Sequence, residues 1–174
     1  NIFLYNSRVA EGEKGGTLYG VEPWHFFAQN LALNFNLIAV LAFALPFLTA
    51  FARAVGVRSL NTSLRKLSPV MAPLLLWVGL MSCLPHKEER FLYVIYPLIC
   101  LCGSLALETA ARTAGLLASS LLPATLSRAA ATRAVRTLLV LVVTLLSAAR
   151  IAAVAIHYGA PLRAYAALSD HHAA

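Results

Sequence analysis

Four long apolar runs constrain the fold of this chain more than any other feature of its sequence. They cover residues 31–51, 69–84, 91–107 and 137–156. A hydrocarbon core of about 30 Å takes roughly 20 helical residues to cross, and the runs approach or reach that length. Because no water satisfies backbone groups there, a chain crosses as helices or as a closed barrel. The runs are continuous rather than alternating, which predicts an all-α polytopic membrane protein with about four transmembrane helices.

Basic residues between the runs predict how these helices are oriented. The segment 52–66 contains four basic residues and no acidic one, and the segment 108–136 contains four arginines and one glutamate. Cytosolic loops carry an excess of Lys and Arg, so we expect both segments on the cytosolic side. The 85–90 loop and both ends of the chain are then lumenal. The net charge of +7 is mostly explained by this orientation and does not indicate nucleic-acid binding.

These expectations divide the chain into a membrane domain at 30–156, a lumenal loop at 1–29 and a short lumenal tail at 157–174. The stretch 109–136 is rich in Ala, Ser, Thr and Arg, which fits an interfacial helix or a loose cytosolic loop. A fifth span there would instead move the tail to the other side. The chain begins at Asn1 without a basic-then-apolar leader, so we expect a C-terminal or internal piece of a longer protein.

Residues 85–91, PHKEERF, place a charged cluster between the second and third runs. At a membrane surface, Arg and Lys can contact phosphate, carboxylates can accept from sugar hydroxyls, and His can move a proton near neutral pH. If Pro85 begins the third helix, His86, Glu89 and Arg90 share one face. A head-group site and an ordinary solvated turn both remain open. The candidate residues are His86, Lys87, Glu88, Glu89 and Arg90.

A second cluster, LYGVEPWHF at residues 18–26, lies at the edge of the first run. Its aromatic side chains suit the belt that membrane proteins carry at the interface, and they could also bind a sugar ring. Asn30 and Asn34 follow on one helical face, where we expect hydrogen bonds between helices. The three cysteines match no metal-ligand spacing, so neither a metal nor a cofactor is expected. The candidates here are Glu22, Trp24 and His25.

Several stretches resemble a known enzyme family. HKEERF at residues 86–91 resembles the signature of the endoplasmic-reticulum mannosyltransferases that use dolichyl phosphate mannose, the HKEERF-type family of GT-C fold. The stretches at 18–36, 92–103 and 157–165 are similar to the members that form α-1,2 linkages on the lipid-linked oligosaccharide of N-glycosylation. The resemblance extends from about residue 3 to residue 165.

The resemblance implies part of a GT-C type bundle in the endoplasmic reticulum membrane. It implies inverting transfer of mannose from dolichyl phosphate mannose to dolichyl-diphosphate oligosaccharide on the lumenal side. His86, Lys87 and Arg90 then fit contacts with the donor phosphate, and Glu88 and Glu89 fit contacts with sugar. Family members carry their presumed catalytic base in an upstream lumenal loop that nothing here matches. The catalytic residue is therefore unknown, and an N-terminal half missing from this chain is an expected partner.

Two other functions stay open. A catalytically inactive, truncated membrane protein that binds polyprenyl phosphate or a partner glycosyltransferase would use the same charged surface. A transporter is suggested by Arg150 within the fourth run and by proline-broken runs, although paired half-spans of the transporter kind are not apparent. Loss of transfer in the variants His86→Ala or Arg90→Ala would favour the enzyme, and solute flux across vesicles would favour the transporter.

Overall fold

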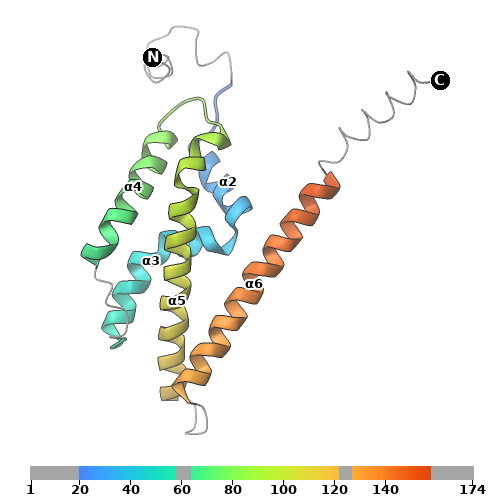
Figure 1. The fold of residues 1–174 in the computed structure, drawn as a ribbon. Helices are drawn as coiled ribbons and strands as arrows, with labels where there is room; N and C mark the ends of the chain where they lie inside the picture. Colours follow the sequence, from blue (N-terminus) through green and yellow to red (C-terminus); the bar gives the residue numbers. More distant parts are fainter. Residues whose placement is uncertain (1–19, 58–63, 122–126, 158–174) are drawn as a thin grey trace, which may run out of the picture.

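The computed structural model describes residues 20–57, 64–121 and 127–157, and every regular element in these ranges is a helix. The predicted all-α membrane fold is therefore confirmed. Figure 1 shows α5 at the centre of the arrangement, with α2, α3 and α4 beside it and α6 diverging from it. The helices are α2 (Phe26–Phe35), α3 (Leu37–Ala54), α4 (Leu64–Ser82), the 3-10 helix η3 (Glu89–Ile95), α5 (Tyr96–Leu121) and α6 (Arg128–His157).

Three helical stretches are long and apolar enough to cross a membrane: Leu37–Ala54, Glu89–Leu121 and Arg128–Ile156. The apolar part of α4, Lys66–Ser82, is shorter. Crossing by the 69–84 run and the assignment of segments to the two sides of the membrane stay predictions. The tail from residue 158 onward, and with it most of the 157–165 stretch, lies outside the described residues, as do residues 1–19 of the expected lumenal loop.

The first apolar run is divided into two helices at Asn36. This residue has a φ of 48° and a ψ of −127°, which ends α2 and begins α3 in a new direction. Asn tolerates positive φ better than most residues, so it is a suitable residue for such a break. Pro46 lies inside α3 without ending it. The first predicted span is therefore a short helix followed by a longer one.

The core is formed where α3 crosses α5. These two helices make the most extensive packing in the structure, and large apolar side chains from α2, α4 and η3 complete the buried cluster. The crossing is close because Gly103 has no side chain: a Cβ there would lie 2.6 Å from Cγ2 and 2.9 Å from the carbonyl oxygen of Ile38. Small residues allow membrane helices to approach in this way. The fully buried members include Phe27, Leu45, Leu74, Leu92, Ile95 and Ile99.

The segment 108–136, expected as a cytosolic loop or interfacial helix, is instead mostly taken up by two long helices. Helix α5 continues to Leu121, and α6 begins at Arg128. The Ala-rich composition favours helix. Glu108 is paired with Arg112 and Arg136, which lowers the free-energy cost of a charged side chain in a helix beside an apolar run. The two helices therefore pack against each other beyond the ends of the apolar runs.

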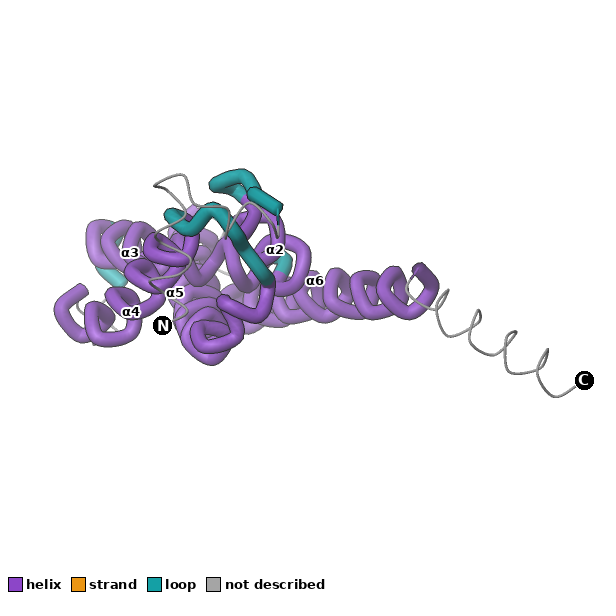
Figure 2. The backbone as a smooth tube through the Cα atoms, turned by 90° about the horizontal axis from the view of Figure 1, so that it is seen from above, coloured by secondary structure: helices purple, strands orange, loops and turns teal. Residues whose placement is uncertain are grey.

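Helix α6 packs mainly against α5 and then runs away from the bundle, as Figures 1 and 2 both show. The two helices touch at Gly115, where a Cβ would lie 2.0 Å from Oγ1 of Thr132 and 2.9 Å from its Cα atom. No residue of the most apolar 18-residue window of α6 is buried. The apolar surface of α6 is thus available to lipid or to further helices.

Candidate functional site

Two segments far apart in the sequence meet at one end of the bundle. The loop between α4 and η3 carries residues 83–88, and the segment 20–25 leads into α2. The amide of Glu22 donates a hydrogen bond of 3.1 Å to the carbonyl of Pro85, and Nδ1 of His86 lies 3.4 Å from the carbonyl oxygen of Gly20. The two clusters that the sequence suggested separately therefore form one surface.

Lys87 joins these two segments from within. Its side chain is only 6% exposed, and its ammonium donates to the carbonyl oxygens of Glu22 at 2.8 Å and Leu84 at 2.6 Å. Charge-assisted hydrogen bonds of this length are stronger than those between neutral groups. Buried lysines need such partners, because an unpaired charge away from water is costly. Lys87 therefore holds the Glu22 segment against the loop.

Glu88 lies between His86 and Arg90 on the outer side of the loop. Nε2 of His86 lies 2.9 Å from Oε1 of Glu88, and Nη2 of Arg90 donates to the same oxygen at 2.9 Å, while Nε of Arg90 pairs with the other oxygen. The hydrogen bond with His86, and next the one from Arg90, hold the pKa of Glu88 below its ordinary value of 4.5. The guanidinium of Arg90 is 68% exposed and can reach a ligand outside the loop.

Glu89 faces the bundle rather than the outside. Its Oε1 atom accepts a hydrogen bond of 2.6 Å from Nδ2 of Asn34 on α2 and one of 3.3 Å from the hydroxyl of Tyr96 on α5. The side chain of Phe35 packs edge to face on Tyr96, with 4.6 Å between ring centroids. Glu89 is thus a partly buried carboxylate oriented by two neutral donors from two helices.

The expected helical face of His86, Glu89 and Arg90 does not form. The regular helix begins only at Glu89, and Glu88 before it is extended, with a φ of −130° and a ψ of 145°. His86 therefore lies in the loop and reaches Arg90 through Glu88 instead. Because Glu88 is extended, its own carboxylate points outward, whereas the carboxylate of Glu89 points toward the bundle.

The aromatic residues near the site differ in their exposure and in their contacts. Trp24 is 78% exposed and stands edge to face with His25, with 5.6 Å between ring centroids. Tyr93 is 55% exposed. Trp77 in α4 instead donates its indole N–H to the carbonyl of Phe91 at 2.7 Å, which fixes the start of η3. Trp24 and Tyr93 are the rings that remain available to a ligand.

Sequence reasoning identified Asn34 but not Tyr96 or Trp77. The interhelical hydrogen bond expected of Asn34 is confirmed by its contact with Glu89, whereas the amide of Asn30 bonds to the carbonyl of Phe26 in its own helix. Tyr96 and Trp77 lie in apolar runs, where their polar atoms need a partner. That requirement was the available signal for both residues.

The surface combines groups suited to a phosphorylated sugar. It presents an exposed guanidinium at Arg90, an imidazole and a carboxylate paired at His86 and Glu88, and an exposed indole at Trp24. Guanidinium binds phosphate through two parallel donors, and aromatic faces pack on sugar rings. Within the described ranges, no three His, Cys, Asp or Glu side chains gather as metal ligands would.

Comparison with known proteins gives a consistent result. The family model of the Alg9-like mannosyltransferase family matches residues 1–174. The α-1,2-mannosyltransferase alg9 of Schizosaccharomyces pombe is 34% identical over 172 residues, which cover 97% of this chain and 29% of that protein. The human α-1,2-mannosyltransferase ALG9 is 41% identical over 109 residues, and the Saccharomyces cerevisiae protein of the same name is 42% identical over 106 residues.

These last two matches cover 62% and 61% of the chain but only 17% and 16% of the respective proteins. The chain therefore spans less than a third of the length of these relatives. No solved structure matches the chain significantly.

Proposed function

Because this chain belongs to the Alg9-like mannosyltransferase family, we propose that it forms part of a multi-pass mannosyltransferase of the endoplasmic reticulum membrane. The donor is dolichyl phosphate mannose, the acceptor is dolichyl-diphosphate oligosaccharide, and the new linkage is α-1,2. The names of the relatives support the linkage, since those from fission yeast, human and budding yeast are called α-1,2-mannosyltransferases. The reaction takes place on the lumenal side, where the positive-inside rule puts the PHKEERF loop.

The joining of the PHKEERF loop to the Glu22 segment is the observation that carries this proposal. The contacts of Glu22 with Pro85 and Lys87 bring cations, carboxylates and an exposed indole to one end of the bundle. A polyprenyl-linked sugar phosphate has its phosphate at the membrane surface and its sugar just outside. The surface offers groups of both kinds, an exposed arginine at Arg90 for the phosphate and an exposed indole at Trp24 for the sugar.

Each site residue has a distinct role in the proposed reaction. Arg90 and His86 contact the donor phosphate and stabilise the charge that develops on it as the glycosidic bond breaks. Glu88 orients both of them through its two carboxylate oxygens. Lys87 acts as a positioning residue, since its ammonium donates to the backbone carbonyls of Glu22 and Leu84.

The remaining candidates contact the sugars. Glu89, held by Asn34 and Tyr96, accepts from a sugar hydroxyl, and Trp24 and His25 border the sugar from the Glu22 segment. The general base that activates the acceptor hydroxyl lies elsewhere in the complete protein. Two substrates held in fixed geometry account for much of the barrier reduction in such a reaction.

The test uses the full-length gene product in membranes that lack this activity. Dolichyl phosphate mannose and the under-mannosylated lipid-linked oligosaccharide are supplied, and the glycan is weighed by mass spectrometry. We expect a gain of one or more hexoses, which digestion with an α-1,2-specific mannosidase removes. Transfer from GDP-mannose but not from dolichyl phosphate mannose would contradict the assigned donor.

The variant Arg90→Ala separates an enzyme from a protein that only binds the lipid. Removing one charge-assisted contact, about 1.5–3 kcal/mol, should lower kcat/KM for the donor at least about tenfold. Arg53→Ala removes another exposed arginine, at the end of α3, and should leave transfer unchanged. Full transfer by Arg90→Ala would refute its role, and donor binding by the wild-type protein without any transfer would favour the inactive, lipid-binding alternative.

A further inference from the structure

A second polar site lies between α5 and α6, at the end of α5 opposite the PHKEERF loop (Figure 1). It is an open cavity of about 520 Å³. That volume falls in the range of sites that bind small molecules, about 300–1,000 Å³. We call it the arginine pocket, and its lining residues are Arg112, Arg128, Ala129, Thr132, Arg133 and Arg136.

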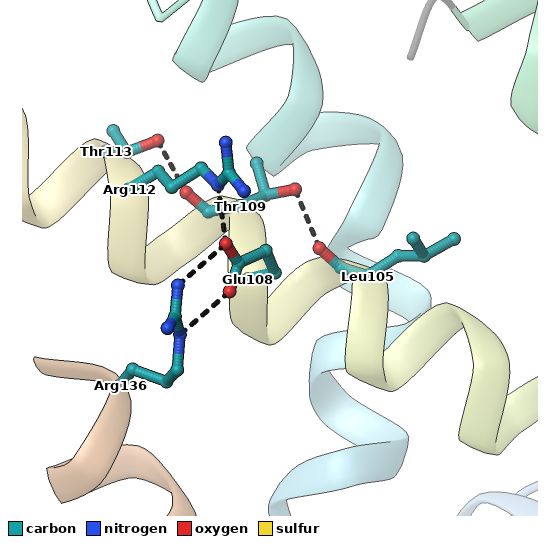
Figure 3. Close-up of polar contacts among 6 residues, drawn as sticks. All are labelled: Leu105, Glu108, Thr109, Arg112, Thr113 and Arg136. Atoms are coloured by element: carbon teal, nitrogen blue, oxygen red, sulfur yellow. Dashed lines mark hydrogen bonds and ion pairs between the residues drawn. The ribbon is translucent and has the colours of Figure 1, made fainter. Parts of the chain in front are cut away.

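The charges around the arginine pocket do not balance. Glu108 pairs with two of the lining arginines. Arg136 donates to both of its carboxylate oxygens at 2.9 Å, and Arg112 donates from the other side, as Figure 3 shows. Within the described part of the chain, neither Arg128 nor Arg133 has a carboxylate partner. One carboxylate thus faces four guanidinium groups, and a further negative charge would be favourable there.

The N-terminus of α6 adds to this positive potential. Helix α6 starts at Arg128, its first turn contains no acidic residue, and Ser127 caps it by accepting from the amide of Ala130 at 3.2 Å. The helix dipole favours negative charge at an N-terminus and disfavours cations. Three arginines in the first nine residues of α6 oppose that preference. Such a local conflict is expected where the charges serve to bind something.

The arginine pocket lies just outside the two apolar runs, where lipid phosphates are expected. On α5 the apolar run 91–107 ends one residue before Glu108, and on α6 the run 137–156 begins one residue after Arg136. The ion pair between Glu108 and Arg136 places the two boundaries at the same level. Arginines just outside a hydrocarbon core face the head-group layer. The contact between Gly115 and Thr132 keeps the two helices close enough for arginines from both to line one cavity.

From these observations we infer that the arginine pocket binds the phosphate of an anionic lipid head group, on the membrane face opposite the proposed transfer site. Arg128 and Arg133 contact the phosphate directly, and Glu108 orients Arg112 and Arg136 at the edge of the pocket. A planar guanidinium donates two parallel hydrogen bonds to phosphate oxygens, so two arginines can satisfy one phosphate group. The acyl chains extend along the exposed apolar surface of α6.

The test measures lipid binding to the full-length protein purified in a neutral detergent. Dioctanoyl phosphatidylglycerol, dioctanoyl phosphatidylcholine and inorganic phosphate are titrated separately, and binding is followed by native mass spectrometry and by the shift in thermal unfolding. We expect phosphatidylglycerol to bind with an apparent Kd at least about tenfold below that of phosphatidylcholine, because choline neutralises the phosphate. Raising the salt concentration should weaken this binding.

A matched pair of double variants locates the site. Arg128→Gln/Arg133→Gln should raise the apparent Kd for phosphatidylglycerol at least about tenfold, since it removes the two direct phosphate contacts. Arg53→Gln/Lys66→Gln removes two exposed positive charges outside the arginine pocket and should leave that Kd unchanged. Equal loss in both double variants would show a general charge effect and overturn the assignment.

Two further outcomes would also overturn it. Wild-type protein that binds the two lipids equally has no anionic head-group site. Saturation by inorganic phosphate at the same concentration would assign the pocket to a soluble phosphate instead of a lipid. Arg128→Lys/Arg133→Lys keeps the charge but loses the two-point geometry, so it should bind more weakly than wild type and more tightly than the glutamine pair.

Discussion

Replacing Lys87 by Met tests whether this residue is a structural tie between two segments or a contact for the donor phosphate. Methionine keeps most of the apolar stem and removes the ammonium. The two hydrogen bonds lost, to the carbonyls of Glu22 and Leu84, are charge-assisted and almost fully buried. Hydrogen bonds to charged groups contribute about 1.5–3 kcal/mol each. Of these two, the bond to Glu22 joins the segments, since Leu84 lies in the same loop as Lys87, so separation of the two segments should become easier by about 1.5–3 kcal/mol.

Hydrogen exchange at the Glu22 amide measures that separation directly, because this amide donates to the carbonyl of Pro85 beside the tie. A change of about 1.5–3 kcal/mol corresponds to roughly 10- to 150-fold faster exchange in the variant. The control is Arg90→Met, which removes an exposed cation from the same loop and should leave the Glu22 amide protected. Mannose transfer by Lys87→Met should decline with temperature more steeply than in wild type, since the proposed site requires the loop and the Glu22 segment to stay joined.

One result would refute this reasoning. If Lys87→Met leaves exchange at Glu22 unchanged while the KM for the donor rises, the ammonium contacts substrate and its carbonyl partners are incidental. The structural role would then pass to the backbone hydrogen bond between Glu22 and Pro85 alone.

Three other changes test the packing, the charge and the orientation of the site. Gly103→Leu should lower the free energy of unfolding in detergent by about 1–3 kcal/mol, because its Cβ would lie 2.6 Å from Cγ2 of Ile38 on α3. The control Gly79→Leu should be tolerated, because no atom lies within 4 Å of the added Cβ. The pKa of Glu88 is lowered in the folded protein, so its ionised carboxylate stabilises the loop at pH values above the ordinary pKa of 4.5. This contribution disappears as the pH falls below 4.5 and passes the lowered pKa of the folded state. Glu88→Gln should abolish that part of the pH dependence of hydrogen exchange in residues 84–91. Asn34→Leu removes the 2.6 Å donor that orients the partly buried Glu89 and should reduce transfer at least about tenfold. Asn30→Leu should leave transfer unchanged, since the amide of Asn30 bonds within its own helix.

The helical architecture could be predicted from the sequence because it depends on length and continuity of apolar runs. Those features are local, and the bilayer permits few alternatives. The break at Asn36 could not be predicted in the same way. Asn occurs both in continuous membrane helices and at positive φ, and the crossing of α3 over α5 at Gly103 determines which conformation this one takes. The ion pair of Glu108 with Arg136, 28 residues apart, could not be read from the sequence either.

The composition of the site was apparent from the sequence, but its geometry was not. A lysine in a run of charged residues is ordinarily exposed, and only the approach of Glu22 from 65 residues away buries Lys87. The opposite directions of Glu88 and Glu89 follow from one extended residue before a 3-10 helix. No periodic pattern in PHKEERF indicates where that helix begins. The joining of the two sequence clusters is therefore information that only the folded chain supplies.

The packing of α6 mainly against α5 has a mechanical consequence. Beyond Thr132, where Gly115 fixes the crossing, α6 extends to Ile156 over about 36 Å at 1.5 Å per residue, with its most apolar window wholly unburied. A rotation of about five degrees at the crossing would displace the far end by about 3 Å over that length. Tilt is how membrane helices adapt to bilayer thickness. A small tilt of α6 in a thicker or thinner membrane would therefore change the spacing between its far end and the rest of the bundle.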